Sequence, residues 1–280
     1  MANHHNFFNT DEIHDRTQSQ LQHSKELQNE LTVANTSLGI TLVDFDKSKH
    51  IRVKSYLDTV GSGEDQDTAS NSPVVCHLDT WGDSIMYSAE CTWFSAFNDH
   101  DIQSGTASIN PCGEYISVGI DFEREYATIP KVVCWLRALH LGMAGDWRID
   151  VTPIDITTKG CKLNFRVWGT TQAHWIEASW IAYSSDRSDV ESGEFSTMEQ
   201  REWTIPQHNH EKKVTFSKNF EHPPVVYLAI NRIDETNDGN LRVKAYVQDV
   251  TAQGMSVHLD SWGDTVMYTT VGQWIALQHR

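Results

Sequence analysis

The sequence predicts an all-β protein made of three tandem antiparallel β-sandwich domains. First, the run HLDTWGDSIMY at 77–87 returns as HLDSWGDTVMY at 258–268, which indicates an internal repeat. Second, segments such as 225–234 and 241–250 alternate apolar and polar residues, as strands with one buried face do. Third, no helical stretch separates these short segments, which favours a small sandwich for each repeat.

The repeat unit has a fixed order: an arginine that opens an alternating segment, a turn, a second alternating segment, Trp-Gly, and a second tryptophan. The second tryptophan follows the first by twelve residues in every copy: Trp81 and Trp93, Trp168 and Trp180, Trp262 and Trp274. The arginine precedes the first tryptophan by twenty residues at Arg148 and Arg242, and by twenty-nine at Arg52. The excess falls on the polar run GSGEDQDTASN, which predicts a loop insertion in the first copy.

Strands are predicted at 51–60, 225–234, 241–250 and 256–262, with turns at DETNDGN and TAQG between the last three. The motifs IQSGTASI at 102–109 and VESGEFST at 190–197 mark where the second and third copies begin. We therefore predict repeat 1 at 21–98, repeat 2 at 99–187 and repeat 3 at 188–280. The polar, Gln-rich opening indicates a flexible segment at 1–20, followed by a short helix or a degenerate first strand.

Composition narrows the class of function. The 280 residues are 39% hydrophobic and carry a formal charge of −16, which argues against a protein that follows nucleic-acid phosphates. No run of 18 apolar residues occurs, and the N-terminus has neither a basic start nor an apolar core. We expect a soluble chain made in the cytoplasm without a signal peptide, and secretion by an unconventional route stays open.

Cysteine and histidine patterns do not indicate a metal framework. The five cysteines, Cys76, Cys91, Cys112, Cys134 and Cys161, include no CxxC pair, and most of them are expected to be free thiols in strands rather than disulfides. Neighbouring histidines at 3–5 and 208–210 point to opposite faces of any strand, so we predict solvated loops there rather than a metal or nuclease site. No cofactor is expected.

An ordered set of motifs resembles the H-type lectin domain, the fold of snail agglutinins and of the C-terminal domain of slime-mould discoidins. The set comprises SG at the start, FEHPPVV at 220–226, NLRV at 240–243, Gly254, WGDT at 262–265, Tyr268 and WIA at 274–276. The resemblance covers repeat 3, most of repeat 2 and about the second half of repeat 1. It implies a six-stranded antiparallel sandwich that forms a threefold trimer and binds N-acetylgalactosamine or galactose without a metal ion, between protomers. Three repeats in one chain then predict an intrachain pseudo-threefold trimer.

The resemblance assigns sugar contacts to the arginine and to the Trp-Gly loop of each repeat. The matching residues are Arg52, Trp81, Gly82 and Asp83; Arg148, Trp168 and Gly169; and Arg242, Trp262, Gly263 and Asp264. Thr170 stands where the other two repeats have the aspartate. Tyr87 and Tyr268 either contact sugar or fill the next strand, and repeat 2 has His174 at that position.

These residue types suit a pyranose, which offers C–H patches and hydroxyls that both donate and accept. An aromatic face covers the first, while an arginine fork, a carboxylate and backbone at a glycine serve the second. The alternative for the arginines is an ordinary ion pair on a strand, and for the first tryptophans a loop anchor. The second tryptophans, Trp93, Trp180 and Trp274, are predicted to be core residues.

Three functions remain open from the sequence. The first is a multivalent lectin or agglutinin that binds glycans with terminal N-acetylgalactosamine or galactose on glycoproteins or cell surfaces. The second is a glycan-processing enzyme with Asp79 and Asp83, or Asp260 and Asp264, as an acid pair, which we disfavour because the same residues recur at several places. The third is a structural module with decayed sites. We predict that sites at Trp81 and Trp262 bind alike, and that the site at Trp168 is weaker or different.

Overall fold

The computed structural model describes residues 6–13, 21–27, 36–59, 73–95, 99–110 and 113–278. This part of the chain consists of strands and two single turns of 3-10 helix, η1 (Thr10–Glu12) and η4 (Thr197–Glu199). The predicted all-β class is confirmed. Among the described residues there is no helix with the length and apolar character needed to span a bilayer.

In the described parts of the chain, each repeat contributes six strands. Repeat 1 holds β1 (Phe7–Asn9), β2 (Ser24–Leu27), β3 (Thr36–Phe45), β4 (Ile51–Thr59), β5 (Val74–Asp79) and β6 (Met86–Ser95). Repeat 2 holds β7 (Ile102–Ile109), β8 (Tyr115–Asp121), β9 (Lys131–Leu141), β10 (Trp147–Ile154), β11 (Gly160–Val167) and β12 (Ala173–Tyr183). Repeat 3 holds β13 (Val190–Ser196), β14 (Glu211–Thr215), β15 (Val225–Glu235), β16 (Leu241–Gln248), β17 (Gly254–Asp260) and β18 (Met267–Leu277).

The repeats are joined by shared sheets. The described strands form three six-stranded sheets, each with three strands from one repeat and three from another: β1-β6-β3-β16-β17-β14, β13-β18-β15-β10-β11-β8 and β2-β5-β4-β9-β12-β7. The strand pairs that cross between repeats are β3 with β16, β15 with β10, and β9 with β4. Repeat 1 thus joins repeat 3, repeat 3 joins repeat 2, and repeat 2 joins repeat 1. This cyclic closure agrees with the predicted intrachain pseudo-trimer.

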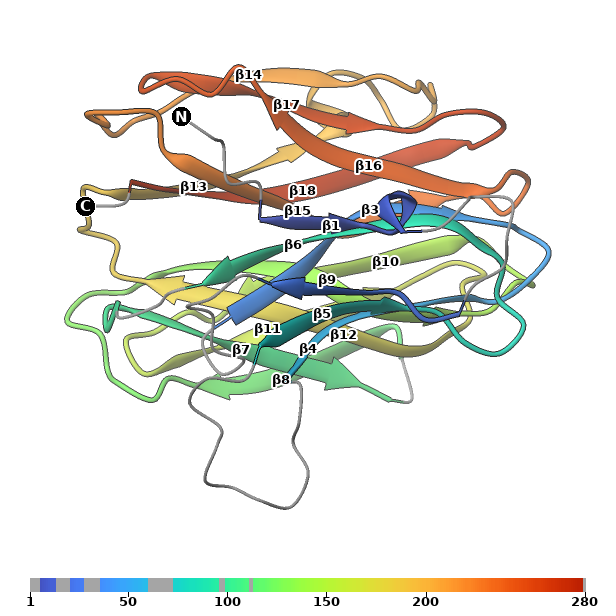
Figure 1. Ribbon diagram of the computed structural model, residues 1–280, viewed down its shortest axis with the longest axis horizontal. Helices are drawn as coiled ribbons and strands as arrows, with labels where there is room; N and C mark the ends of the chain where they lie inside the picture. Colours follow the sequence, from blue (N-terminus) through green and yellow to red (C-terminus); the bar gives the residue numbers. More distant parts are fainter. Residues whose placement is uncertain are drawn as a thin grey trace.

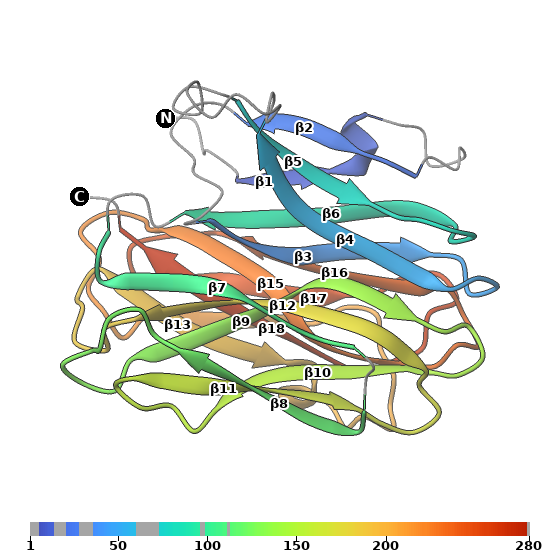
Figure 2. The same cartoon turned by 90° about the horizontal axis from the view of Figure 1, so that it is seen from below.

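Figure 1 shows β3 beside β16, although the two strands lie near opposite ends of the chain. In Figure 2, β2 and β5 of repeat 1 lie at the top and β8 and β11 of repeat 2 at the bottom. Sharing removes an exposed edge from β3, β9 and β15, whose main-chain groups would otherwise be free to pair with another chain.

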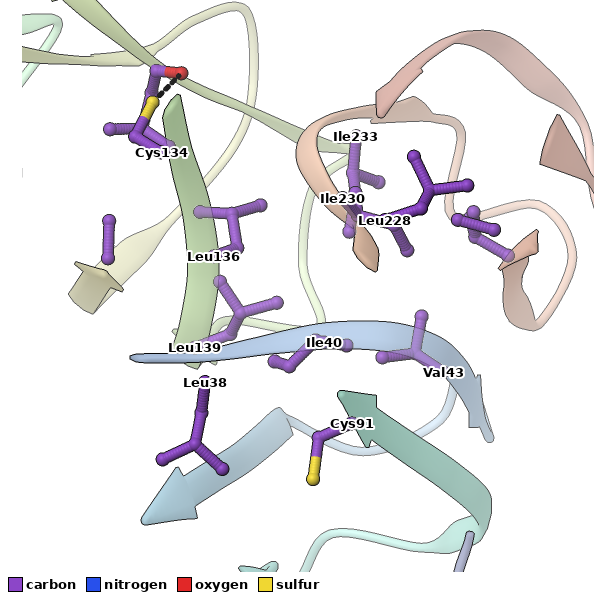
Figure 3. Packing of buried hydrophobic residues seen from close by; sticks show 14 of the residues in the cluster. Leu38, Ile40, Val43, Cys91, Cys134, Leu136, Leu139, Leu228, Ile230 and Ile233 are labelled. Atoms are coloured by element: carbon purple, nitrogen blue, oxygen red, sulfur yellow. Dashed lines mark hydrogen bonds between the residues drawn. The ribbon is translucent and has the colours of Figure 1, made fainter. Parts of the chain in front are cut away.

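The strands β3, β9 and β15 meet in the centre of the molecule, where their apolar residues pack together (Figure 3). At one level Gly39, Trp135 and Ala229 occupy equivalent positions on these three strands. A Cβ added at Gly39 would lie 2.4 Å from the Ala229 Cβ and 2.9 Å from the Trp135 Cβ. Trp135 is fully buried, and its Nε1–H donates to the carbonyl oxygen of Gln273 at 2.8 Å. One large and two small residues therefore fill the pseudo-threefold axis.

The start of the chain differs from the expected flexible segment at 1–20. Strand β1 pairs with β6, and Phe8 is fully buried. Asn9 caps η1 through a capping box, as Ser196 caps η4 in repeat 3. Residues 6–13 are thus the first strand and turn of repeat 1, and β2 is the short strand that follows. A three-residue strand is too short to show a period in the sequence, which is why it was not predicted.

The burial of side chains confirms the predictions for the second tryptophans and for the described cysteines. Trp93, Trp180 and Trp274 are 6%, 7% and 4% exposed, so the second tryptophans belong to the core. The glycines of the SG motifs, Gly105 and Gly193, allow this packing: added Cβ atoms would lie 2.9 and 2.6 Å from the neighbouring indole rings. The described cysteines are buried free thiols; Cys112 and the loop insertion at 61–71 lie outside the described residues.

Candidate functional site

The three predicted arginines lie where one repeat pairs with the next. Arg52 on β4 is opposite His140 on β9, which we call seam 1. Arg148 on β10 is opposite Asp234 on β15, at seam 2. At seam 3, Arg242 on β16 is opposite Asp44 on β3. Each arginine therefore faces a residue from a different repeat.

The Trp-Gly loop covers the arginine of its own repeat in all three copies. Its glycine adopts a positive φ of 67°, 68° and 67° at Gly82, Gly169 and Gly263. An added Cβ at these positions would lie 2.8, 2.6 and 2.7 Å from the Nη1 atom of Arg52, Arg148 and Arg242, respectively. Glycine is needed for the backbone conformation and for the close approach of the guanidinium. The loop tryptophans Trp81, Trp168 and Trp262 are all partly exposed.

At seam 3, two carboxylates hold the arginine. The Nε–H of Arg242 donates to Asp44 Oδ1 at 3.1 Å, and its Nη1 donates to Asp264 Oδ1. Partial burial acts to raise the pKa of Asp264, but the hydrogen bonds from Arg242 and from the Asn240 backbone hold it below its ordinary value. Asp264 remains 57% exposed, so it offers free lone pairs to a ligand.

Tyr87 of repeat 1 belongs to seam 3 rather than to the arginine of its own repeat. Its hydroxyl donates to Asp46 Oδ2 at 2.8 Å. This hydrogen bond, with burial, raises the pKa of Tyr87, while the positive charge of Arg242 opposes the shift. The arginine and Trp-Gly loop of repeat 3 thus share a site with an aspartate and a tyrosine of repeat 1.

Seam 2 has the same plan with one substitution. Arg148 pairs through Nη2 with Asp146 at 2.6 Å and through Nε with Asp234 at 3.4 Å. Tyr268 of repeat 3 lies beside it, with its ring centroid 5.7 Å from the guanidinium carbon. The loop position that carries Asp83 and Asp264 elsewhere is Thr170 here, and its hydroxyl accepts from the Asp146 N–H at 3.1 Å. The carboxylate missing from the loop is therefore replaced by one on the preceding connection.

The surroundings of Trp168 also differ from those of the other loop tryptophans. The guanidinium carbons of Arg166 and Arg232 lie 5.5 and 5.0 Å from its ring centroid. A surface pocket of about 480 Å³ adjoins the ring and is lined by Gly113, Glu114, Val167, Trp168, Gly169, Thr171, Gln172 and Ala173. Both cations lie over the indole, and both also lie within 4.0 Å of the Asp150 carboxylate.

At seam 1, histidines replace the neighbour's aspartate and tyrosine. The Nε–H of Arg52 donates to His140 Nε2 at 3.1 Å, and its Nη1 donates to Asp83 Oδ1 at 2.6 Å. This hydrogen bond from Arg52 is the main cause that lowers the pKa of Asp83. Burial, followed by the charge of Arg52, lowers the pKa of His140 to about 4, so this imidazole is neutral near neutral pH.

Aromatic rings gather around the same seam. The Trp81 ring lies 6.1 Å from His140 and 6.1 Å from Trp175 of repeat 2, measured between centroids. The ammonium of Lys54 lies 5.3 Å from the Trp175 ring centroid. Repeat 2 thus adds His140 and Trp175 to the aromatic surroundings of Trp81, and neither residue was predicted.

The residues missed by sequence reasoning share one signal. Asp44, His140 and Asp234 each precede the arginine of their own repeat by eight residues. Their recurrence was visible, but each one contacts the arginine of another repeat. Only the strand pairs across the seams show this exchange.

In each acidic pair considered for catalysis, the two aspartates bind different groups. Asp79 accepts from the Tyr56 hydroxyl at 2.8 Å and from the His23 N–H at 2.8 Å. Asp260 accepts from the Tyr246 hydroxyl at 2.8 Å and from the His210 N–H at 2.9 Å. These bonds give both aspartates a role in fixing their strands, while Asp83 and Asp264 bind the arginines.

Histidines near these strands are packed rather than free. His77 and His258 lie on β5 and β17 and stack on Tyr56 and Tyr246, with ring centroids 4.5 Å apart in both cases. The prediction of a solvated loop at 208–210 is wrong at its last residue: His210 is 1% exposed, and its Nε2 accepts from Arg201 Nε at 2.8 Å. His208 is exposed, and the histidines at 3–5 lie outside the described residues.

Comparisons with known proteins find a family match in two of the repeats. The family model of the H-type lectin domain matches residues 117–183 and 211–277. Among solved structures, the chain is similar to recombinant discoidin II of Dictyostelium discoideum, with 16% sequence identity, a TM-score of 0.27, and coverage of 57% of this chain and 82% of that chain. A search of curated proteins finds no match. The two family matches lie in repeats 2 and 3, and repeat 1 has the same strand order in the structure.

Proposed function

We propose that the chain is a multivalent lectin that binds terminal N-acetylgalactosamine or galactose at its three seams, since the family model of the H-type lectin domain matches two of its three repeats. The proposed contacts are Arg52, Trp81, Gly82, Asp83, Tyr87, Arg148, Trp168, Gly169, Arg242, Trp262, Gly263, Asp264 and Tyr268. The partners are glycans on glycoproteins or cell surfaces.

One observation carries the proposal: each seam combines an arginine that is held by at least one carboxylate with a partly exposed Trp-Gly loop. A guanidinium held in one orientation presents its remaining N–H donors to ligand hydroxyls at little entropic cost. The neighbouring indole offers a face for the C–H patch of a sugar ring. A structural ion pair alone does not require the loop glycine to lie against the guanidinium in all three repeats.

The three seams are not equivalent. Seams 2 and 3 share an aspartate and a tyrosine from the neighbouring repeat, Asp234 with Tyr268 and Asp44 with Tyr87. Seam 1 has histidines at these positions. We therefore revise the expected grouping: seams 2 and 3 bind related ligands, and seam 1 differs.

The test is a glycan array with the full chain, followed by calorimetric titration with N-acetylgalactosamine. We expect a galactose-type hit and binding at seam 3 that is lost in Arg242→Ala, because a ligand hydroxyl then loses a charge-assisted bond of about 1.5–3 kcal/mol. Lys131→Ala, an exposed change at the start of β9, is the matched control and should leave the titration unchanged.

A structural module is the second candidate, favoured by the carboxylates that already occupy each arginine. If the chain is a structural module, the folded wild type should bind no glycan on the array. The Arg242→Ala variant should then give the same result as the wild type in the array and in the calorimetric titration. That result would contradict the lectin proposal. Agglutination of glycan-coated beads separates one working seam from several, since crosslinking needs at least two sites on one molecule.

A further inference from the structure

Three histidines meet at seam 1. His50 lies just before β4 in repeat 1, and His140 and His174 lie on β9 and β12 of repeat 2. One ring nitrogen from each histidine lies within 4.8 Å of the other two. The ring centroid of His174 is 4.6 Å from that of His140 and 5.7 Å from that of His50. Two repeats thus bring three imidazoles to one point of the surface.

The equivalent positions of the other seams carry different chemistry. Seam 2 has Asp146, Asp234 and Tyr268, and seam 3 has Asn240, Asp44 and Tyr87. All three seams keep the arginine and the Trp-Gly loop, so these shared features do not require imidazoles. Only seam 1 has histidine at all three positions, so a function specific to this seam would explain the three imidazoles.

Nitrogen donors in this number suit a transition-metal ion. Imidazole is a preferred ligand of Zn²⁺, Cu²⁺ and Ni²⁺, and three histidines leave one position of a tetrahedral site open. Zn–N bonds of about 2.0–2.1 Å place tetrahedral ligand atoms about 3.3 Å apart, so the ring nitrogens have to approach one another by up to about 1.5 Å when an ion binds. The Nδ1 atom of His50 is buried and has no hydrogen-bond partner among the described residues. His174 is exposed, which leaves the cluster accessible from solvent.

We propose that seam 1 binds one divalent transition-metal ion through ring nitrogens of His50, His140 and His174, with Zn²⁺ as the probe. The ion ties repeat 1 to repeat 2 across the β4–β9 pair. This proposal does not depend on glycan binding, because its ligands are not among the sugar contacts proposed above.

The metal competes with Arg52 for one histidine. The Nε–H of Arg52 donates to His140 Nε2, so coordination through that nitrogen displaces this hydrogen bond. The bond from Arg52 Nη1 to Asp83 leaves the guanidinium with a partner after displacement. Bound metal therefore removes one of the hydrogen bonds that hold Arg52, a residue of the proposed sugar site at seam 1.

The experiment is calorimetric titration of the untagged full chain, stripped with a chelator, with Zn²⁺. We expect one ion per chain, and at least about tenfold weaker binding in His174→Tyr and in His50→Asn, since even outer partners of metal ligands contribute 10–100-fold. Both replacements are the residues of seam 3, which the fold already accepts. His222→Asn is the matched control, because His222 is exposed and belongs to no potential metal cluster of the described residues.

A second measurement keeps a folding defect from being mistaken for ligand loss. Zn²⁺ should raise the unfolding temperature of the wild type and of His222→Asn, but not that of the two seam variants, whose unfolding temperatures without metal report their stability. No stoichiometric binding, or equal affinity in all four proteins, would overturn the metal site. A chain that binds Zn²⁺ but no glycan contradicts only the proposed lectin function, and a chain that binds glycan but no Zn²⁺ contradicts only the metal site.

Discussion

At the scale of single residues, Glu235 places a carboxyl group in the described core. It ends β15 and is fully buried, and the backbone N–H of Arg242 lies beside its carboxyl group. The equivalent residues, Phe45 on β3 and Leu141 on β9, are apolar and also fully buried. Burial raises the pKa of Glu235 well above its ordinary value of 4.5, because a charged carboxylate is poorly solvated there.

This residue predicts a pH dependence of stability. The folded state holds the Glu235 proton more tightly than the unfolded state, so its contribution is complete below pH 4.5 and is lost as the pH rises through the folded pKa. Glu235→Gln removes this loss of stability at higher pH, because glutamine has no carboxyl group to ionise. We expect the unfolding temperature of the variant to exceed that of the wild type by a margin that grows from about pH 4 to about pH 8. Exposed Glu123→Gln is the control, and a margin that is constant with pH would contradict the prediction.

At the scale of elements, the Trp-Gly loop and the strand below it act together. Gly263 combines a positive φ with a Cβ position 2.7 Å from the Nη1 atom of Arg242. Any side chain at this position strains the backbone and moves the guanidinium away from Asp44 and Asp264.

Gly263→Ala should therefore lower the free energy of unfolding by about 1–3 kcal/mol, the cost of a non-glycine residue held in the left-handed region. It should also weaken glycan binding at seam 3, as calorimetry can measure. Gly119→Ala on β8 is a matched control, since an added Cβ there meets nothing within 4 Å. Equal effects of the two changes would show that the contact with Arg242 is unimportant.

Strands with clear alternation were predictable, and short or irregular ones were not. The predicted segments at 51–60, 225–234 and 241–250 correspond to β4, β15 and β16. In contrast, β1 has three residues and β2 four, and tertiary pairing with β6 and β5 fixes them in place of local propensity. Likewise, the sequence identified the arginines and the Trp-Gly loops but not Asp44, His140 or Asp234, which complete each site from another repeat.

At the scale of the whole molecule, joining the three repeats in one chain allows different residues to meet at the pseudo-threefold axis. An identical residue from each of three separate protomers would meet itself at the axis, whereas Gly39, Trp135 and Ala229 differ in size and fill the space together. Trp135 also bonds to Gln273 of repeat 3, so the axis connects neighbouring repeats by a hydrogen bond as well as by packing.

Gly39→Ala should destabilise the molecule by about 1–3 kcal/mol, the typical effect of overpacking in a core. The added methyl meets Ala229 at 2.4 Å, so Ala229→Gly in the same chain should restore part of the loss. Urea unfolding of the two single variants and the double variant measures this coupling. Strictly additive effects would contradict direct packing of these residues at the axis.

The sequence by itself determined the local features of this protein: the repeat, its strand-forming alternation, the buried second tryptophans and the loop glycines. These follow from neighbouring residues and from comparison of one repeat with another. Only the tertiary structure decided which repeat completes which site, because the pairs β3–β16, β9–β4 and β15–β10 join segments far apart in the chain. Periodicity specifies which face of a strand is buried but not which strand lies beside it. For that reason the histidines of seam 1 became a cluster only in the folded chain.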